Sequence, residues 1–139
     1  MSTPDNTPGT LWIVATPIGT LGDVSPRARD VLGEADVILA EDTRRARALL
    51  SNLDLPAAGR VQSLHEHNEI RKVDDLTSKL ENGVSIALIS DAGTPVLSDP
   101  GFVLVRAARQ SEIPVRSVPG PSSFTSALAV SGQPPLPAT

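Results

Sequence analysis

Five short segments of this chain combine glycines, prolines, carboxylates and basic side chains in patterns that suit ligand binding. The most heavily specified runs from Ser90 to Gly101 and contains two glycines, two prolines and two aspartates. It follows an aliphatic run that predicts a buried strand, and Asp99 with Pro100 fits the cap and first turn of a following helix. Loops at the carboxyl ends of strands are where open α/β sheets bind ligands. We therefore expect a binding site at this loop.

Two further segments are rich in glycine and proline. Residues 15–23 hold two glycines but lack the full Gly-x-Gly-x-x-Gly pattern, so a dinucleotide site is only weakly indicated and a tight structural turn is the alternative. Residues 118–123 place a Pro-Gly-Pro turn before a predicted helix, whose free N–H groups suit an anion or a carboxylate. Taken alone, this turn fits a structural role equally well.

Basic residues cluster in the segment that begins at Glu41. Five of the ten arginines lie between Arg27 and Arg47, although the chain has a net charge of −4. Asp42 fits a helix cap, with Arg44 and Arg45 directly behind it. An arginine cluster beside a ligand-binding edge suits phosphate, whereas a solvated helix face is the plainer alternative.

Both histidines of the chain, His65 and His67, flank Glu66. This spacing raises the hypothesis of a metal site, but further ligands are not evident nearby and the helical His-Glu-x-x-His pattern is absent. We favour neutral imidazoles that hydrogen-bond a ligand or the loop backbone, with a purely structural loop as the alternative. No bound metal is expected.

The elements that must position these segments alternate between strand and helix. Strands are predicted at Leu11–Ala15, Val37–Ala40, Arg60–Leu64, Val84–Ser90 and Val115–Val118. Helices are predicted to start at Ser25-Pro26, Asp42, Asn68 and Gly120-Pro121 and to end near Gly33, Leu50, Asn82-Gly83 and Gly132. A further helix is predicted over Phe102–Gln110, opened by the cap and first turn at Asp99-Pro100. This alternation predicts an α/β fold: a three-layer domain with a mostly parallel five-stranded sheet flanked by helices, whose post-strand loops share one edge.

Composition sets the outer limits. Hydrophobic residues make up 40% of the 139, enough for one ordinary domain, and aromatic residues only 2%. Cysteine is absent, which excludes thiolate chemistry and fits a reducing cytoplasm, and no apolar run is long enough for a membrane span. We predict a cytoplasmic protein with a disordered leader at 1–10, a ligand-binding domain at 11–132 and the start of a linker at 133–139.

Five ordered motifs together resemble one known family. They are Ala-Thr-Pro-Ile-Gly-x-Leu-Gly-Asp from Ala15, Glu-Asp-Thr-Arg from Glu41, Leu-His-Glu-His-Asn-Glu from Leu64, Ser-Asp-Ala-Gly-Thr-Pro-x-x-Ser-Asp-Pro-Gly from Ser90, and Pro-Gly-Pro-Ser from Pro119. In this order and spacing they resemble the ribosomal RNA small-subunit methyltransferase I family of the tetrapyrrole methylase superfamily. The resemblance spans roughly residues 11–134.

This resemblance implies transfer of a methyl group from S-adenosyl-L-methionine to the ribose 2′-hydroxyl of a cytidine in 16S rRNA of the small ribosomal subunit. It also implies a homodimer and a cofactor cleft between two α/β domains, of which this chain holds the first. The implied cofactor-binding residues are Thr16, Pro17, Ile18, Gly19, Asp91, Ala92, Gly93, Thr94, Pro95, Pro121 and Ser122.

A ribose hydroxyl is a poor nucleophile, so a group must accept its proton. We predict Glu41 and His65 on the acceptor side, and Arg44 with Arg45 on RNA phosphate. A lysine base is not expected, because Lys72 and Lys79 fall within a predicted helix, away from the loops. The alternatives are a methylase acting on a tetrapyrrole, a non-catalytic isolated domain, and a metal-dependent hydrolase.

Overall fold

The computed structural model describes residues 7–16, 24–91 and 101–118, which form five strands and four helices. The strands are β1 (Leu11–Thr16), β2 (Val37–Ala40), β3 (Val61–Ser63), β4 (Ile86–Asp91) and β5 (Val115–Val118). The helices are α1 (Pro26–Glu34), α2 (Thr43–Asn52), α3 (Glu69–Glu81) and α4 (Phe102–Gln110). The predicted alternation of strand and helix is confirmed over these residues, and the predicted fifth helix lies outside them.

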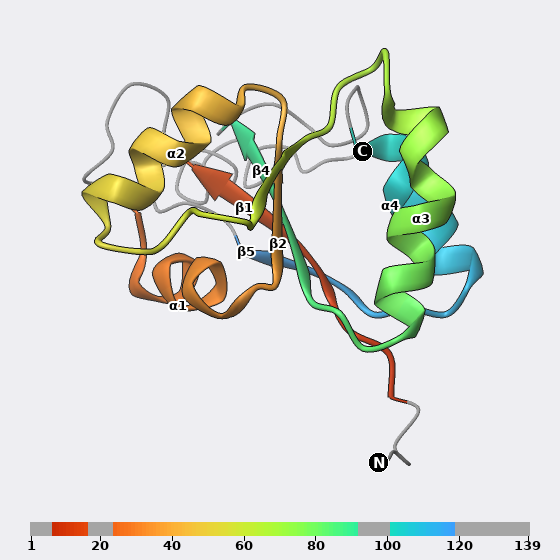
Figure 1. Cartoon of the computed structure of the whole chain (residues 1–139). Helices are drawn as coiled ribbons and strands as arrows, with labels where there is room; N and C mark the ends of the chain where they lie inside the picture. The colour runs from red at the N-terminus through yellow and green to blue at the C-terminus, as the bar shows by residue number, and fades with distance from the viewer. Residues whose placement is uncertain (1–6, 17–23, 92–100, 119–139) are drawn as a thin grey trace, which may run out of the picture.

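The sheet has the order β3-β2-β4-β1-β5, and every pairing in it is parallel. Figure 1 shows the strands between two layers of helices, with α1 and α2 on one face and α3 and α4 on the other. The predicted three-layer α/β fold is therefore confirmed. Because all strands run the same way, the segments that follow them emerge at one edge, which we call the carboxyl edge.

Each face of the sheet has its own apolar core, because successive side chains of a strand point to opposite faces. One core joins Leu11, Leu39 and Leu88 of the strands to buried leucines of α3 and α4. The other joins Val14 and Ile38 to buried residues of α1 and α2. Aliphatic side chains fill both, as the low aromatic content requires.

The starts of the helices are only partly as predicted. Ser25 caps α1 and Asp42 caps α2 through side-chain oxygens, as expected. Asn68 is the N-cap residue of α3, as predicted, but its side chain makes no capping hydrogen bond to this helix. The helix predicted over Phe102–Gln110 is confirmed by α4, whose N-cap is Gly101, and the predicted cap and first turn at Asp99-Pro100 lie outside the described residues.

The segment before β1 contacts the domain, contrary to the disorder expected up to residue 10. The Gly9 N–H donates to the Leu80 carbonyl at 2.7 Å, and the Ile86 N–H donates to the Thr10 carbonyl at 3.1 Å. A Cβ at Gly9 would lie 2.0 Å from the Val84 oxygen, so this close approach requires glycine. Ordered contacts therefore begin before Leu11.

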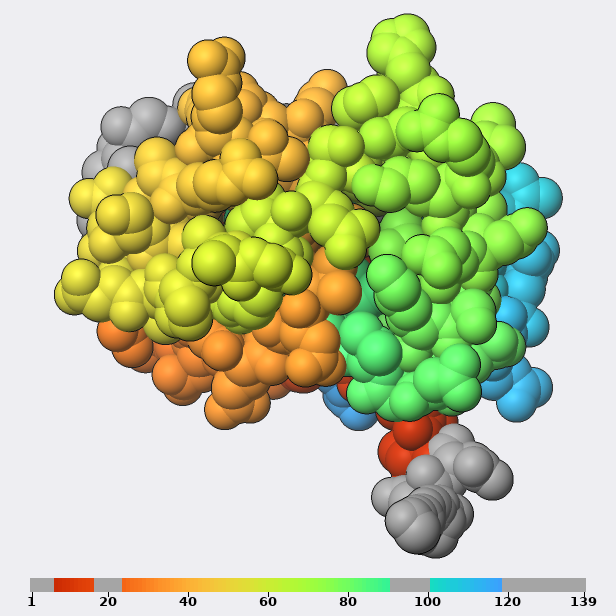
Figure 2. Space-filling model, viewed as in Figure 1, coloured from red at the N-terminus to blue at the C-terminus, as the bar shows by residue number. Residues whose placement is uncertain are grey.

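The surface seen in Figure 2 is formed by the two helical layers and the chain that joins them. Atoms of α3 (green) cover most of α4 (blue) from this side, and the segment between α2 and α3 (yellow to yellow-green) fills the surface between these helices. Over the described residues, no helix has both the length and the apolar character needed to cross a bilayer.

Candidate functional site

The sheet has a topological switch point between β4 and β1, its central strand and one neighbour. The chain leaves β1 for α1 on one face, and it leaves β4 for α4 on the other. Connections that diverge in this way leave a crevice at the carboxyl edge, which is the usual ligand position in open α/β sheets. Thr16 and Asp91 end these two strands and lie opposite each other in register.

Thr16 and Asp91 are the two predicted cofactor-binding residues within the described part of the chain. Thr16 is buried, and its hydroxyl donates to the Ser90 carbonyl of the neighbouring strand at 3.4 Å. The fold therefore brings the first and fourth predicted segments together at the switch point. The other predicted cofactor residues lie outside the described residues: Pro17, Ile18, Gly19, Ala92, Gly93, Thr94, Pro95, Pro121 and Ser122.

Glu41 follows β2, the other neighbour of β4, and is exposed at the carboxyl edge. Next to it, one carboxylate oxygen of Asp42 accepts from the backbone N–H groups of Arg44 at 3.0 Å and Arg45 at 3.3 Å. Both arginine side chains are exposed, and no described residue forms an ion pair with them. Their guanidinium groups are thus available to an anionic partner at this edge.

A buried asparagine holds the His65 segment in place after β3. The Asn68 Oδ1 accepts from the His65 backbone N–H at 2.8 Å, and the Asn68 Nδ2 donates to the Ser63 Oγ at 3.1 Å. Asn68 is 5% exposed, so these bonds are made away from water. The Asn68 side chain therefore fixes the loop that carries both histidines, instead of bonding the first N–H groups of α3.

The hydrogen bonding of His65 indicates which of its ring nitrogens carries the hydrogen in the neutral ring. The His67 backbone N–H donates to the His65 Nδ1 at 3.2 Å, so in the neutral ring Nδ1 accepts and Nε2 carries the hydrogen. The His67 ring packs edge-on against it, with centroids 5.8 Å apart. In this tautomer His65 offers a donor to a ligand. Of the two predicted acceptor-side residues, Glu41 is thus better suited to take a proton.

Lys72 contradicts the expectation that no lysine lies near the loops. Its Nζ donates to the Ser63 carbonyl, at the carboxyl end of β3, at 2.7 Å. Burial lowers the pKa of Lys72 below its usual value of 10.5, and Arg71 and Lys79 lower it further, while Asp75 acts in the opposite direction. A lysine side chain spans about one helical turn, which is why a position inside α3 reaches the edge of the sheet.

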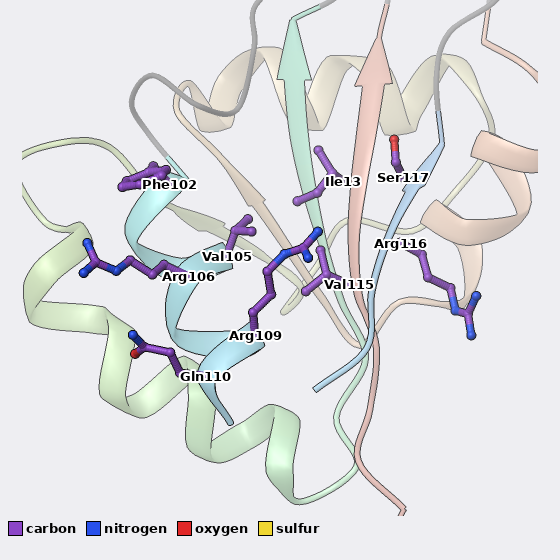
Figure 3. Close-up of a pocket in the computed structure, with 9 residues that line it drawn as sticks. All are labelled: Ile13, Phe102, Val105, Arg106, Arg109, Gln110, Val115, Arg116 and Ser117. Atoms are coloured by element: carbon purple, nitrogen blue, oxygen red, sulfur yellow. The ribbon is translucent and has the colours of Figure 1, made fainter. Parts of the chain in front are cut away.

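A groove lies beside α4, over β1 and β5. This groove of about 630 Å³ has an apolar floor that includes Ile13, Val105 and Val115. Figure 3 shows Arg109 extending from α4 across it towards the strands, whereas Arg106 and Arg116 point away. Within residues 7–16, 24–91 and 101–118, no predicted site residue lines this groove.

Comparison with known proteins identifies the family. The model of the Tetrapyrrole (Corrin/Porphyrin) Methylases matches residues 10–136, which is most of the chain. The chain belongs to the tetrapyrrole methylase family. Among the relatives of this methylase-family chain are proteins named Ribosomal RNA small subunit methyltransferase I. That of Xylella fastidiosa is 54% identical over 93% of this chain and 46% of the relative, and that of Escherichia coli O157:H7 is 48% identical over 94% and 45%.

The methylase-family chain thus spans about half the length of the curated relatives it matches. Among solved structures, the uroporphyrin-III-C-methyltransferase of Thermus thermophilus has a TM-score of 0.60 at 24% identity, covering 91% of this chain and 54% of that one. A cobalt precorrin-4 methyltransferase has a TM-score of 0.66 at 17% identity, covering 88% and 50%. At these identities the likeness concerns the fold alone.

Proposed function

We propose that this chain is part of an enzyme that transfers a methyl group from S-adenosyl-L-methionine to the ribose 2′-hydroxyl of a cytidine in 16S rRNA. The observation that carries this proposal is the 54% identity, over 93% of the chain, with a relative named Ribosomal RNA small subunit methyltransferase I. The convergence of Thr16 and Asp91 at the switch point gives the cofactor a position consistent with the fold.

The residues at the switch point suit this cofactor. When bound, S-adenosyl-L-methionine supplies a methyl group attached to a positively charged sulfur. The Asp91 carboxylate would accept hydrogen bonds or face that charge, while Thr16 lies on the neighbouring strand end. We propose that Pro17–Gly19, Ala92–Pro95, Pro121 and Ser122 complete the cofactor surface, within a domain that extends to residue 132 and is followed by the start of a linker at 133–139.

On the acceptor side, we propose that Glu41 accepts the proton of the ribose hydroxyl and that the His65 Nε2–H donates to the same ribose. Holding the hydroxyl oxygen in line behind the S–CH₃ bond contributes about 7–11 kcal/mol in well-oriented systems. General base assistance typically adds about 10²–10⁴-fold. Positioning is therefore the larger contribution, and the rigid sheet edge suits it.

Arg44 and Arg45 are proposed to contact RNA phosphates. Their exposure and their lack of ion-pair partners among the described residues support this role. Replacing both with alanine should weaken binding to small subunits and make the affinity less dependent on salt, by about 0.7–0.9 in the log–log slope for each phosphate that is no longer neutralised. Arg71→Ala, an exposed arginine on α3, is the matched control. An unchanged affinity and slope in the double variant would contradict this assignment.

The activity is tested with tritiated S-adenosyl-L-methionine and small subunits that lack the modification. Two proteins are compared: this chain alone, and this chain fused to the part of the Xylella fastidiosa relative that it does not match. We expect the fusion to label RNA at ribose, read out as an alkali-resistant dinucleotide. Labelling of a tetrapyrrole, with none of RNA, would favour the small-molecule alternative, and no labelling by a cofactor-binding fusion would favour a non-catalytic domain.

For the chain alone we expect weak cofactor binding or none, because the resemblance implies a cleft with a second wall. Micromolar affinity in a calorimetric titration would contradict this expectation. We further propose a homodimer in the cytoplasm, without a bound metal. Sedimentation equilibrium, cell fractionation and metal analysis of the purified protein test these three points.

A further inference from the structure

Glu69 is a buried carboxylate for which the proposed reaction has no use. It is the first residue of α3 and only 2% exposed. Its Oε2 accepts from the backbone N–H of Gly101 at 3.1 Å and of Leu104 at 2.9 Å. A side chain of α3 thus accepts two backbone hydrogen bonds at the start of α4.

These two bonds replace a cap that α4 cannot supply for itself. Ser25 and Asp42 cap α1 and α2 with their own side chains, but the N-cap of α4 is Gly101, which has none. Gly101 has a φ of +110°, a conformation that side-chain-bearing residues rarely adopt. A carboxylate is a strong acceptor for N–H groups and is favoured at the positive end of the helix dipole. The start of α4 therefore depends on Glu69.

The same residue is also tied to the loop after β3. The Glu69 backbone N–H donates to the His65 carbonyl at 2.9 Å. Glu69 therefore joins the loop that carries His65 to Gly101, where the connection from β4 to α4 ends. These are two of the connections that leave the carboxyl edge, on the acceptor side and the cofactor side of the proposed site.

We propose that Glu69 is a positioning residue that holds the start of α4 against the His65 loop. It thereby fixes Gly101, the end of the β4–α4 connection, and so positions the cofactor side of the site. Glu69 itself does not contact the cofactor. This inference rests on the proposed function, since it takes the switch point as the site for S-adenosyl-L-methionine. From its position in the sequence alone, Glu69 would be expected to interact with the positive end of the dipole of α3, its own helix.

The test compares Glu69→Gln, Glu69→Ala and Leu76→Ala by NMR. Glutamine keeps an acceptor oxygen, whereas alanine removes it. Leu76→Ala truncates a fully buried residue of the same helix and controls for general destabilisation. We expect the Gly101 and Leu104 amide protons to shift upfield in Glu69→Ala and to move little in the other two variants.

S-Adenosylhomocysteine is then titrated into each variant of the fusion to the Xylella fastidiosa relative, well below its melting temperature. We expect Glu69→Ala to bind about tenfold or more weakly than the wild type, and both Glu69→Gln and Leu76→Ala to remain within about threefold. If Glu69→Ala does not fold, Glu69→Asp, which withdraws the carboxylate by one methylene, is expected to show smaller changes in the same direction in both measurements.

Each result decides a separate point. Unmoved Gly101 and Leu104 amides would overturn the cap, and shifted amides with unchanged affinity would overturn the positioning role. A loss in Leu76→Ala as large as that in Glu69→Ala would assign the effect to general destabilisation and overturn the proposal. A wild-type fusion that binds no S-adenosylhomocysteine would count against the proposed function and remove the positioning role with it, while the amide shifts would still decide the cap.

Discussion

Replacing Asn68 with alanine should destabilise the protein more than its place on a helix end suggests. The Asn68 side chain is 5% exposed and bonds the His65 backbone N–H at 2.8 Å and the Ser63 Oγ at 3.1 Å. Alanine removes both bonds and leaves the His65 N–H without its acceptor. The change therefore tests whether this network holds the loop after β3.

The magnitude follows from the two bonds. Each hydrogen bond contributes about 0.5–1.5 kcal/mol net, and a buried N–H without a partner costs about 1–3 kcal/mol. We expect Asn68→Ala to lower the free energy of unfolding by about 2–4 kcal/mol. For a domain of this size about 1 kcal/mol corresponds to roughly 3–4 °C, so the melting temperature should fall by roughly 6–16 °C.

The assay is urea and thermal unfolding followed by far-ultraviolet circular dichroism and by the fluorescence of Trp12, the single tryptophan. The matched control is Asn82→Ala at the other end of α3, where an exposed Asn82 Nδ2 donates to the Ser78 carbonyl at 2.8 Å. Exposed substitutions of this kind change stability by about 0.5 kcal/mol or less. Equal losses in the two variants would refute the reasoning. Amide exchange at His65 should also accelerate in Asn68→Ala alone.

Three further changes give distinct outcomes. Gly9→Ala places a Cβ 2.0 Å from the Val84 oxygen and should cost about 1–3 kcal/mol in urea unfolding; an unchanged midpoint would show that the segment is not docked. Asp42→Ala removes the cap of α2 and should cost about 1 kcal/mol, measured in the same way, and no loss would contradict the cap. The pKa of Lys72 is lower in the folded protein than in the unfolded chain. Just below pH 10.5 the unfolded chain therefore binds more protons, and the free energy of unfolding should rise as the pH approaches 10.5 from below. Lys72→Met should flatten this rise, which is measurable because the chain has no cysteine or tyrosine, and an equal rise in the variant would assign it to other groups.

The sequence indicated most of the elements because local signals agreed with one another. Val37–Ala40 is an aliphatic run between two acidic residues, Val115–Val118 lies between two prolines, and both are strands with those bounds. Ser25 and Asp42 cap helices because their side chains reach N–H groups two or three residues ahead. Interactions of such short range can be inferred from the order of the residues alone.

The same local reasoning failed where a polar side chain had a distant partner. Asn68 fits a cap by residue type, yet its side chain bonds the preceding loop and the end of β3. Lys72 sits inside a helix, yet its Nζ reaches the carbonyl of Ser63. Asp99-Pro100 fits a cap and first turn, yet the N-cap of α4 is Gly101 and the acceptor for its N–H is the distant Glu69. In each case the deciding contact depends on how an element packs.

By itself, the sequence determined the alternation of strand and helix, the parallel sense of the sheet and the position of Thr16, Glu41 and Asp91 at its carboxyl edge. These features follow from local propensity and from the handedness of crossovers. The strand order was decided only by the tertiary structure. That order makes β1 and β4 neighbours, puts Thr16 opposite Asp91 and brings Glu69 to the start of α4, 32 residues away from Gly101 along the chain. Such pairings depend on which apolar faces bury each other, a property of the whole folded chain that no single segment encodes.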